Sequence, residues 1–274
     1  MGCFLVFLGF TFSAGWSIIE RGLDMHISLQ AEILGYIFGL PITNSLVLSL
    51  LTTVLLVGGG FLVAKSLKMI PNKLQSTVEL MIDGILDFMT QILGDRKQTL
   101  KYFPLVATLF LFILLNNWIG VLPGIGSIGV TEIDHGQEVF VPFFRSANAD
   151  LNTTFALALI AVFAIQMYGI QRLGFFGHAG KFINLTHGPI HFFVGLLELI
   201  GEFAKVLSFS FRLFGNVFAG EVLLVIMMSL LPVWVAFGAL PFFLLEYFVG
   251  FIQALVFAML TLIFLKVATT EVEH

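Results

Sequence analysis

Five charged residues lie in a long apolar stretch near the end of the chain. This stretch, residues 189–231, carries Glu198, Glu202, Lys205, Arg212 and Glu221. A charge at the centre of a membrane-spanning helix costs at least about 2.5–3.5 kcal/mol on insertion scales. Each of these side chains therefore requires an explanation. Carboxyl groups that load and unload protons beside a cation that keeps its own are suited to a proton path.

Helical geometry places four of these side chains on one face. At about 100° per residue, Glu198, Glu202, Lys205 and Arg212 fall within roughly 80° of one another. Glu202 and Lys205 have the spacing of an internal ion pair, so an internal pair and a functional role both remain open for them. The nearest helical neighbours of Arg212 include no carboxylate. Its countercharge must therefore come from another helix or another protein.

Further polar residues accompany this face. Asn216 shares the face of Arg212, whereas Glu221 points about 180° away from it. Glu246 and Gln253 share a face of the next apolar stretch. A guanidinium blocks direct proton flow and attracts a passing carboxylate. Asn216 and Gln253 are suited to hold water or to orient the arginine.

The elements that position these residues must be membrane helices. Apolar residues make up 58% of the 274 residues and charged residues only 11%, against about 45–50% and about 25% in soluble proteins. Several charge-free stretches are long enough to cross a hydrocarbon core of roughly 30 Å. The sequence predicts an all-α polytopic membrane protein with about five transmembrane helices in the lipid bilayer.

Charge and cysteine content exclude other classes. The net charge of −4 offers no surface for a nucleic acid. The one cysteine, Cys3, excludes a disulfide framework and a Cys-based metal site. We expect no cofactor and no metal ion.

An amphipathic helix is predicted over about residues 72–93. Apolar side chains recur there at helical spacing, while Glu79, Asp83, Asp87 and Gln91 lie on another face. This pattern favours a helix in the cytoplasmic membrane interface, with a soluble surface helix as the alternative.

The last third of the chain predicts a hairpin over about residues 189–267. A continuous helix over residues 189–231 would be about 64 Å long, twice the membrane thickness. Such a helix either breaks, near Gly201 or Gly215–Gly220, or lies far from the membrane normal. We predict two long, steeply inclined helices.

Basic residues predict the orientation. Two of them, Arg21 and Arg145, lie on one side, and nine lie on the other: Lys65, Lys68, Lys73, Arg96, Lys97, Lys101, Arg172, Lys181 and Lys266. The side with nine is predicted to be cytoplasmic, as is the C-terminus. Residues 1–43 then form an outer region that starts with either a leader or an extra membrane segment at 1–19, and residues 44–274 form one transmembrane domain.

One run resembles a known family. Residues 210–221, SFRLFGNVFAGE, resemble the signature of subunit a, the proton-channel stator subunit of F-type ATP synthases. Residues 115–123, 146–154, 198–205 and 253–257 and the EVEH ending resemble it as well. The resemblance covers about residues 40–274.

The resemblance implies a role for each matched position. Arg212 would be the essential arginine that faces the rotor ring of c subunits. Glu221, Glu246 and Asn216 would line or border the half-channel to the outside, and Gln253 would sit across from Arg212. Some relatives have histidine at the position of Glu246, so Glu221 and Glu246 here are expected to share a proton.

Further positions match the family less directly. Glu198, Lys205 and His187 match polar positions on the proton path or beside it, and Asn117, Asp150 and Asn152 match polar positions on the outer side. Gly120 stands where some relatives have aspartate, which argues against an acidic residue at that mouth.

The resemblance also implies partners and a location. The chain would work with the c-subunit ring, b-type peripheral stalk subunits and the F1 catalytic head, in a bacterial plasma membrane. It would not be catalytic alone, and no G-x-x-x-x-G-K-[ST] loop for nucleotide is present. The alternatives are a stand-alone ion-coupled transporter or channel, which commonly shows internal repeats not found here, and a membrane scaffold.

Overall fold

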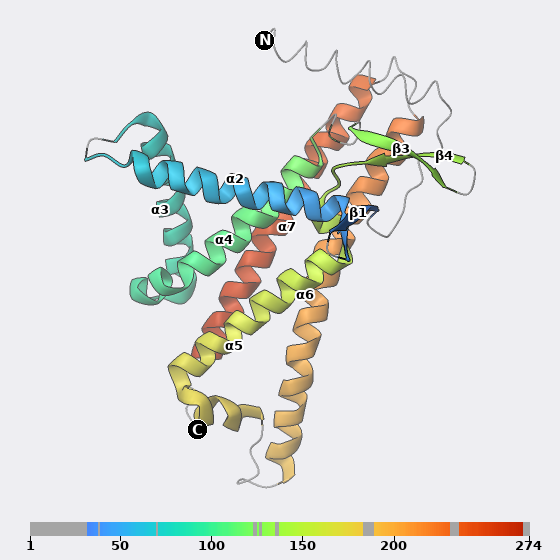
Figure 1. Cartoon of the computed structure of the whole chain (residues 1–274). Helices are drawn as coiled ribbons and strands as arrows, with labels where there is room; N and C mark the ends of the chain where they lie inside the picture. The colour runs from blue at the N-terminus through green and yellow to red at the C-terminus, as the bar shows by residue number, and fades with distance from the viewer. Residues whose placement is uncertain are drawn as a thin grey trace. The chain divides into compact units, whose positions relative to one another are not determined.

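The computed structural model describes residues 32–37, 39–69, 71–122, 125, 128–134, 137–182, 189–230 and 236–270. Within these ranges the chain forms six α-helices and two β-hairpins (Figure 1). The helices are α2 (Asn44–Ser66), α3 (Lys73–Leu93), α4 (Arg96–Gly120), α5 (Leu151–Phe182), α6 (Pro189–Leu230) and α7 (Ala236–Thr269). The expected leader at residues 1–19 and the EVEH ending lie outside the described residues.

Five of the described helices are long and apolar enough to cross a membrane. The candidate spans are Asn44–Ser66, Arg96–Gly120, Leu151–Gly174, Phe193–Met227 and Leu240–Thr269. The third span ends at Gly174, where α5 kinks at a backbone φ of 74° that favours glycine. The prediction of an all-α polytopic membrane fold with about five transmembrane helices is confirmed.

The two hairpins were not predicted from the sequence. Antiparallel strands β1 (Ile33–Ile37) and β2 (Leu40–Thr43) occupy the start of a charge-free stretch, and β3 (Gly129–Asp134) pairs with β4 (Gln137–Pro142). Gly39 takes a positive φ of 81° between β1 and β2, and Pro41 lacks the N–H that a helix interior needs. Helix α2 therefore begins at Asn44.

The chain divides into two compact units. Unit 1 comprises Met1–Leu55, Ile113–Thr153 and Phe214–Phe251, and unit 2 comprises Leu56–Phe112, Thr154–Leu213 and Ile252–His274. The long helices α2, α4, α6 and α7 each contribute residues to both. Each unit thus combines segments that are far apart in the sequence.

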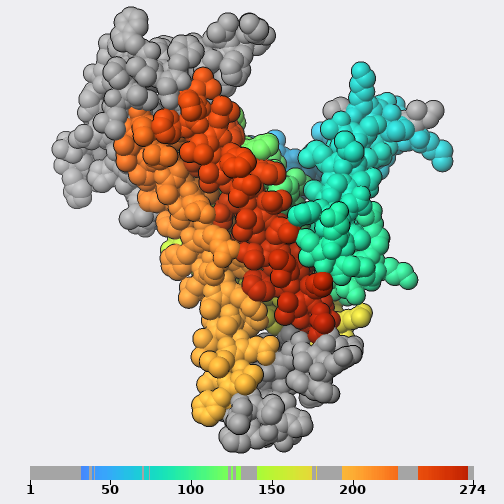
Figure 2. Space-filling model, turned by 180° about the vertical axis from the view of Figure 1, so that it is seen from behind, coloured from blue at the N-terminus to red at the C-terminus, as the bar shows by residue number. Residues whose placement is uncertain are grey.

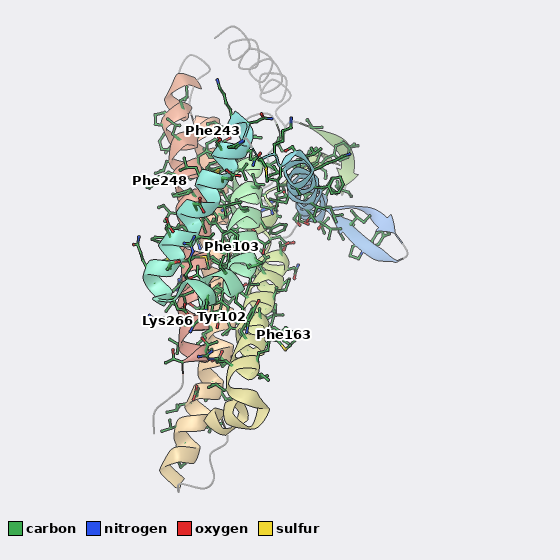
Figure 3. The ribbon with its side chains drawn as sticks, turned by 90° about the vertical axis from the view of Figure 1, so that its left-hand side faces the viewer. Tyr102, Phe103, Phe163, Phe243, Phe248 and Lys266 are labelled. Atoms are coloured by element: carbon green, nitrogen blue, oxygen red, sulfur yellow. The ribbon has the colours of Figure 1, made fainter. Side chains whose placement is uncertain are left out.

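The core of unit 2 joins four helices. Its buried side chains come from α3, α4, α5 and α7: Met89, Leu93, Tyr102, Val106, Ile165, Ala258, Leu262 and Leu265. Tyr102 packs edge-on against Tyr168, with ring centroids 5.1 Å apart. Lys266 Nζ donates a hydrogen bond to the Ile92 carbonyl at 2.7 Å, and Figure 3 labels Tyr102 and Lys266.

The amphipathic helix α3 has nearly the predicted bounds, and part of its apolar face is covered by protein. Met89 and Leu93 are buried in the core of unit 2, whereas Leu80 in the first half of the helix is 75% exposed. Contact of the exposed half with the membrane interface stays a prediction.

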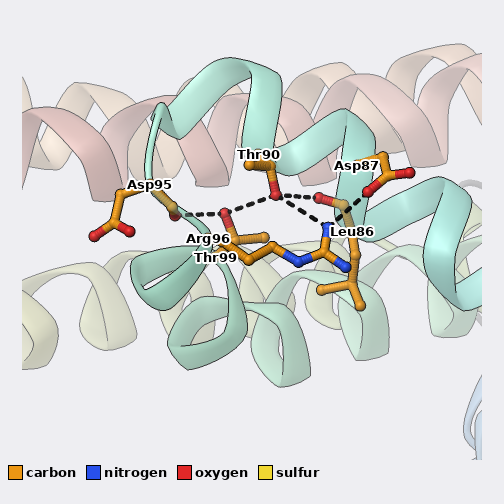
Figure 4. A network of polar contacts seen from close by, with 6 residues as sticks. All are labelled: Leu86, Asp87, Thr90, Asp95, Arg96 and Thr99. Carbon is orange, nitrogen blue, oxygen red and sulfur yellow. Dashed lines mark hydrogen bonds and ion pairs between the residues drawn. The ribbon is translucent and has the colours of Figure 1, made fainter.

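The turn from α3 to α4 is held by a polar network (Figure 4). Gly94 takes a φ of 82° and donates its N–H to the Thr90 carbonyl, so it ends α3 in the left-handed conformation. Arg96 Nη1 donates to Asp87 Oδ1 at 2.6 Å, and Thr99 Oγ1 donates to the Asp95 carbonyl at 2.9 Å. These contacts return the chain to the bundle immediately after α3.

Helix α6 runs through 42 residues as one helix. The alternative of a break near Gly201 or Gly215–Gly220 is therefore wrong. In unit 2, Phe209 of α6 packs against Phe257 and Phe264 of α7, with ring centroids 4.9 Å and 5.7 Å apart, and Figure 2 shows the surfaces of these two helices side by side. The last two helices are long, as predicted, and their inclination to the membrane stays a prediction.

Packing in unit 2 predicts the effect of shortening one side chain of α3. Met89→Ala removes a side chain that is 1% exposed and should lower the free energy of unfolding by about 2 kcal/mol or more, because a cavity remains. Leu80→Ala is the control on the same helix and should change it by less than about 0.5 kcal/mol. Circular dichroism of the purified chain unfolding in detergent measures both. Equal changes in the free energy of unfolding for the two variants would contradict the packing of α3 into the core of unit 2.

Candidate functional site

Arg212 lies on an open groove of unit 2. The groove has a volume of about 250 Å³ and is lined by α6 and α7: Gly201, Ala204, Lys205, Ser208, Phe209, Arg212, Leu260 and Phe264. The exposed side chain of Arg212 donates a hydrogen bond from Nη2 to Ser208 Oγ at 3.3 Å. Among the described residues of unit 2, no carboxylate pairs with Arg212. The groove thus exposes the Arg212 guanidinium, which hydrogen-bonds the Ser208 hydroxyl group.

The other charges of the predicted face behave differently from Arg212. Lys205 Nζ and Glu202 Oε1 are 2.6 Å apart, in side chains that are 26% and 17% exposed. The Lys205 ammonium also lies 4.7 Å from the centroid of the Phe264 ring. The internal ion pair that the spacing permits is therefore present. Glu198 is exposed and makes no ion pair within the described part of unit 2.

A second charged cluster lies in unit 1 on Glu221. Arg145 Nε donates to both carboxylate oxygens of Glu221, at 3.1 Å and 3.3 Å. The Arg145 side chain is only 9% exposed and the Glu221 side chain 33%. The Arg145 guanidinium also lies over the ring of Phe218, 5.9 Å from its centroid. A buried arginine thus pairs with a carboxylate expected on the proton path.

Glu246 of α7 lies beside this cluster. Its side chain is 5% exposed, and it is close enough to Glu221 for the two carboxyl groups to interact electrostatically. The Glu246 carboxyl group occupies the space that a Cβ on Gly220 would fill. Glycine at position 220 therefore allows α6 to approach the carboxyl group closely. The structure thus brings together the two glutamates that the sequence proposed as a proton-sharing pair.

Amide side chains join the elements around this cluster. Asn117 Nδ2 of α4 donates to the Gly250 carbonyl of α7 at 2.9 Å. Asn148 Nδ2 donates to Asn117 Oδ1 at 2.8 Å and to the Ile113 carbonyl at 3.2 Å. All three amide contacts are buried, where an unmade hydrogen bond is costly. They fix the segment before α5 against α4.

The segment that carries Arg145 packs closely against α4 at Gly120. A Cβ on Gly120 would lie 2.6 Å from Ser146 Cβ and 2.8 Å from Ser146 Cα, so a larger residue at position 120 does not fit. Asp150 is buried as well and accepts hydrogen bonds from Ser45 Oγ at 2.9 Å and the Asn152 N–H at 3.0 Å. Two of the outer-side polar residues expected from the resemblance, Asn117 and Asp150, therefore make buried hydrogen bonds.

Two of the remaining predicted positions, Asn216 and Gln253, belong to different units. Asn216 is exposed on α6, in unit 1. Gln253 of α7 is 4% exposed, in unit 2. His187 lies outside the described residues. The expected roles of these three positions stay predictions.

Arg145 is the residue of the site that reasoning from sequence missed. The sequence analysis used Arg145 only as one of two basic residues on the predicted outer side of the membrane. Its partner Glu221 is 76 residues away in the sequence, so no local spacing links them. The available signal was its place directly before residues 146–154, one of the stretches that resemble the family.

Fold and site together define a class: a polytopic membrane protein that carries charged groups on its spanning helices. The model of the family described as ATP synthase A chain matches residues 46–266. The chain belongs to this family.

Individual relatives agree with the family match. The chain is 37% identical over 222 residues to ATP synthase subunit a of Syntrophobacter fumaroxidans, which covers 80% of each chain. It is 34% identical over 215 residues to ATP synthase subunit a 3 of Pelobacter propionicus, covering 77% of this chain and 81% of the relative. It is 33% identical over 219 residues to subunit a of Campylobacter concisus, covering 78% and 86%. The chain is thus a multi-pass membrane subunit of ATP synthase, with the proton-translocating role of its family.

Close packing at Gly220 predicts opposite outcomes for two glycines of α6. Gly220→Ala places a methyl group into the Glu246 carboxyl group and should destabilise the chain by about 1–3 kcal/mol through overpacking. Gly215→Ala, which meets nothing within 4 Å, should stabilise it by up to about 1 kcal/mol, because alanine favours a helix. Unfolding of the purified chain in detergent tests both signs. Stabilisation by both variants would contradict the contact between Gly220 and Glu246.

Proposed function

We propose that this chain is the proton-channel stator of its ATP synthase. It provides two aqueous half-channels, one open to each side of the membrane, and presents Arg212 to the carboxyl groups of a ring of c subunits. Proton flow through the half-channels turns the ring and drives ATP synthesis by the attached F1 catalytic head. Peripheral stalk subunits of the b type hold the chain in place relative to the head.

The surroundings of Arg212 carry the proposal. Its guanidinium is exposed on an apolar pair of helices and hydrogen-bonds Ser208, while Lys205 beside it in the groove is already neutralised by Glu202. A permanent charge in the hydrocarbon region is costly without a countercharge. The described part of unit 2 offers none, so a partner that brings a carboxylate into the groove accounts for it. A carboxylate on each c subunit meets this requirement.

The chemistry is the transfer of a proton between carboxyl groups. A proton from one half-channel converts a c-subunit carboxylate to a neutral acid, which then rotates through lipid without the cost of a buried charge. After almost a full turn this acid reaches the other half-channel, where it releases its proton beside Arg212. The guanidinium keeps its own proton and so prevents a short circuit between the two paths. Each proton supplies about 2.3 kcal/mol for every 100 mV of membrane potential.

The glutamates of unit 1 form the outer half-channel in this proposal. Glu221 and Glu246 exchange the proton, Asn216 borders their path, and Gln253 faces Arg212 from α7. On the same proposal Glu198, Lys205 and His187 lie on the path or beside it. By the positive-inside rule, the C-terminus is proposed to lie in the cytoplasm and residues 1–43 outside. The proposed membrane is a bacterial plasma membrane, as the resemblance implies.

Replacement of Arg212 tests the proposal. Arg212→Ala should abolish ATP-driven acidification of inverted membrane vesicles while the complex remains assembled, because the ring carboxylates lose the charge that makes them release protons. Arg212→Lys should also lose pumping, because an ammonium lacks the planar fork of the guanidinium and gives up its proton more readily.

Arg172→Ala is the matched control, since Arg172 is an exposed arginine of α5, and it should leave pumping at the native level. Copurification of the c ring reports assembly in every variant. Native pumping by an assembled Arg212→Ala complex would contradict the proposal and favour a stand-alone transporter. Tolerance of Arg212→Lys alone would favour a scaffold role for the charge.

A further inference from the structure

The ion pair between Arg145 and Glu221 is partly buried and has a defined geometry. Arg145 Nε contacts both oxygens of the carboxylate, and the arginine is only 9% exposed. The Arg96–Asp87 pair of unit 2 is the contrast, with side chains 45% and 68% exposed. Water and salt screen an exposed pair strongly and a buried pair much less. The charge of Arg145 is therefore screened less from Glu221 than the charge of Arg96 is from Asp87.

The surroundings of Arg145 fix the position of its charge. Residues 145–150 are all buried, and Ser146 is wedged against Gly120. The guanidinium lies over the Phe218 ring, which stacks on Phe214 with ring centroids 5.4 Å apart. A cation over an aromatic face gains further stabilisation when desolvated. The position of Arg145 is thus fixed by the buried segment that carries it and by contact of its guanidinium with the Phe218 ring.

Among the described residues of unit 1, the cluster contains one guanidinium and two carboxyl groups. Glu246 is more buried than Arg145, at 5% against 9% exposure, and its carboxyl group interacts electrostatically with Glu221. Within unit 1, Arg145 forms its ion pair with Glu221 through Nε. If both carboxyl groups were ionised, this largely buried cluster would carry one negative charge in excess. Such a charge is costly, whereas a protonated carboxyl group is neutral.

We infer that Arg145 is a positioning residue that holds Glu221 in the ionised form and leaves Glu246 as the carboxyl group that takes up and hands on the proton. The inference rests on the proposed function and assigns different roles to two glutamates that it treated alike. A proton from the outer water binds the Glu246 carboxylate to give the acid. It leaves that acid for the c-subunit carboxylate, which restores the Glu246 carboxylate.

The test compares charge-removing variants in the assembled ATP synthase by ATP-driven acidification of inverted vesicles. Arg145→Gln should lower the initial rate by about tenfold or more, the scale on which a positioned proton-transfer group acts. Arg145→Lys keeps the charge and should retain most of the rate. Arg96→Gln removes an arginine from the exposed pair and should leave the rate unchanged.

Removing both partners separates positioning from structure. In Glu221→Gln alone, the guanidinium is left to pair with Glu246 and should trap it as a carboxylate, so pumping falls. In the double variant Arg145→Gln/Glu221→Gln, Glu246 has neither neighbour, and the rate should exceed that of either single variant. A residue that only supports the fold predicts the reverse, a double variant no faster than the slower single variant.

Each outcome decides the inference. Loss of pumping in Arg145→Gln with recovery in the double variant supports it. A native rate in assembled Arg145→Gln, or a double variant no faster than Glu221→Gln, overturns it. If Arg145→Gln does not assemble, the Lys and double variants decide by the same comparison. The Arg212→Ala variant, measured in the same way, distinguishes failure of the proposed function from failure of this inference. Native pumping by Arg212→Ala would contradict the proposed function, whereas the Arg145 and Glu221 variants test the roles of the two glutamates.

Discussion

A charge inside the hydrocarbon region needs a countercharge, and the source of that countercharge organises this structure. Glu202 and Lys205 satisfy each other within one helix, 2.6 Å apart. Glu221 obtains its countercharge from Arg145, on a segment that is distant in sequence. Arg212 has a hydroxyl contact with Ser208 and no ion pair in the described part of unit 2. The countercharge thus comes from the same helix for Lys205, from a distant segment of the chain for Glu221 and, in the proposed function, from a partner subunit for Arg212.

Small residues let the helices approach these charges. Gly220 allows the Glu246 carboxyl group to lie against α6, and Gly120 allows Ser146 to lie against α4. Asn117 and Asn148 then bind the same elements through buried amide hydrogen bonds. The positions of the charges thus depend on side chains that carry no charge. Because close packing transmits small displacements, a methyl group at either glycine is expected to move the site.

Local patterns in the sequence were sufficient to predict the helices and the identity of one charged face. The amphipathic period predicted α3 to within one residue, and the apolar length of residues 189–231 predicted a long α6. The internal pair of Glu202 and Lys205 follows from a spacing of three residues. The strands β1 and β2 escaped prediction because a short apolar run does not distinguish a strand from a helix. Arg145 escaped because its partner is 76 residues away, and only the fold brings the two together.

The central claim is that a c-subunit carboxylate provides the countercharge of Arg212. A cryo-electron microscopy structure of the assembled ATP synthase tests this most directly, through the surroundings of the Arg212 guanidinium. The account predicts that the groove of α6 and α7 faces the ring and that a ring carboxyl group approaches Arg212 directly or through one water molecule. A guanidinium that pairs with a carboxylate of its own chain, or a groove that faces away from the ring, would contradict it.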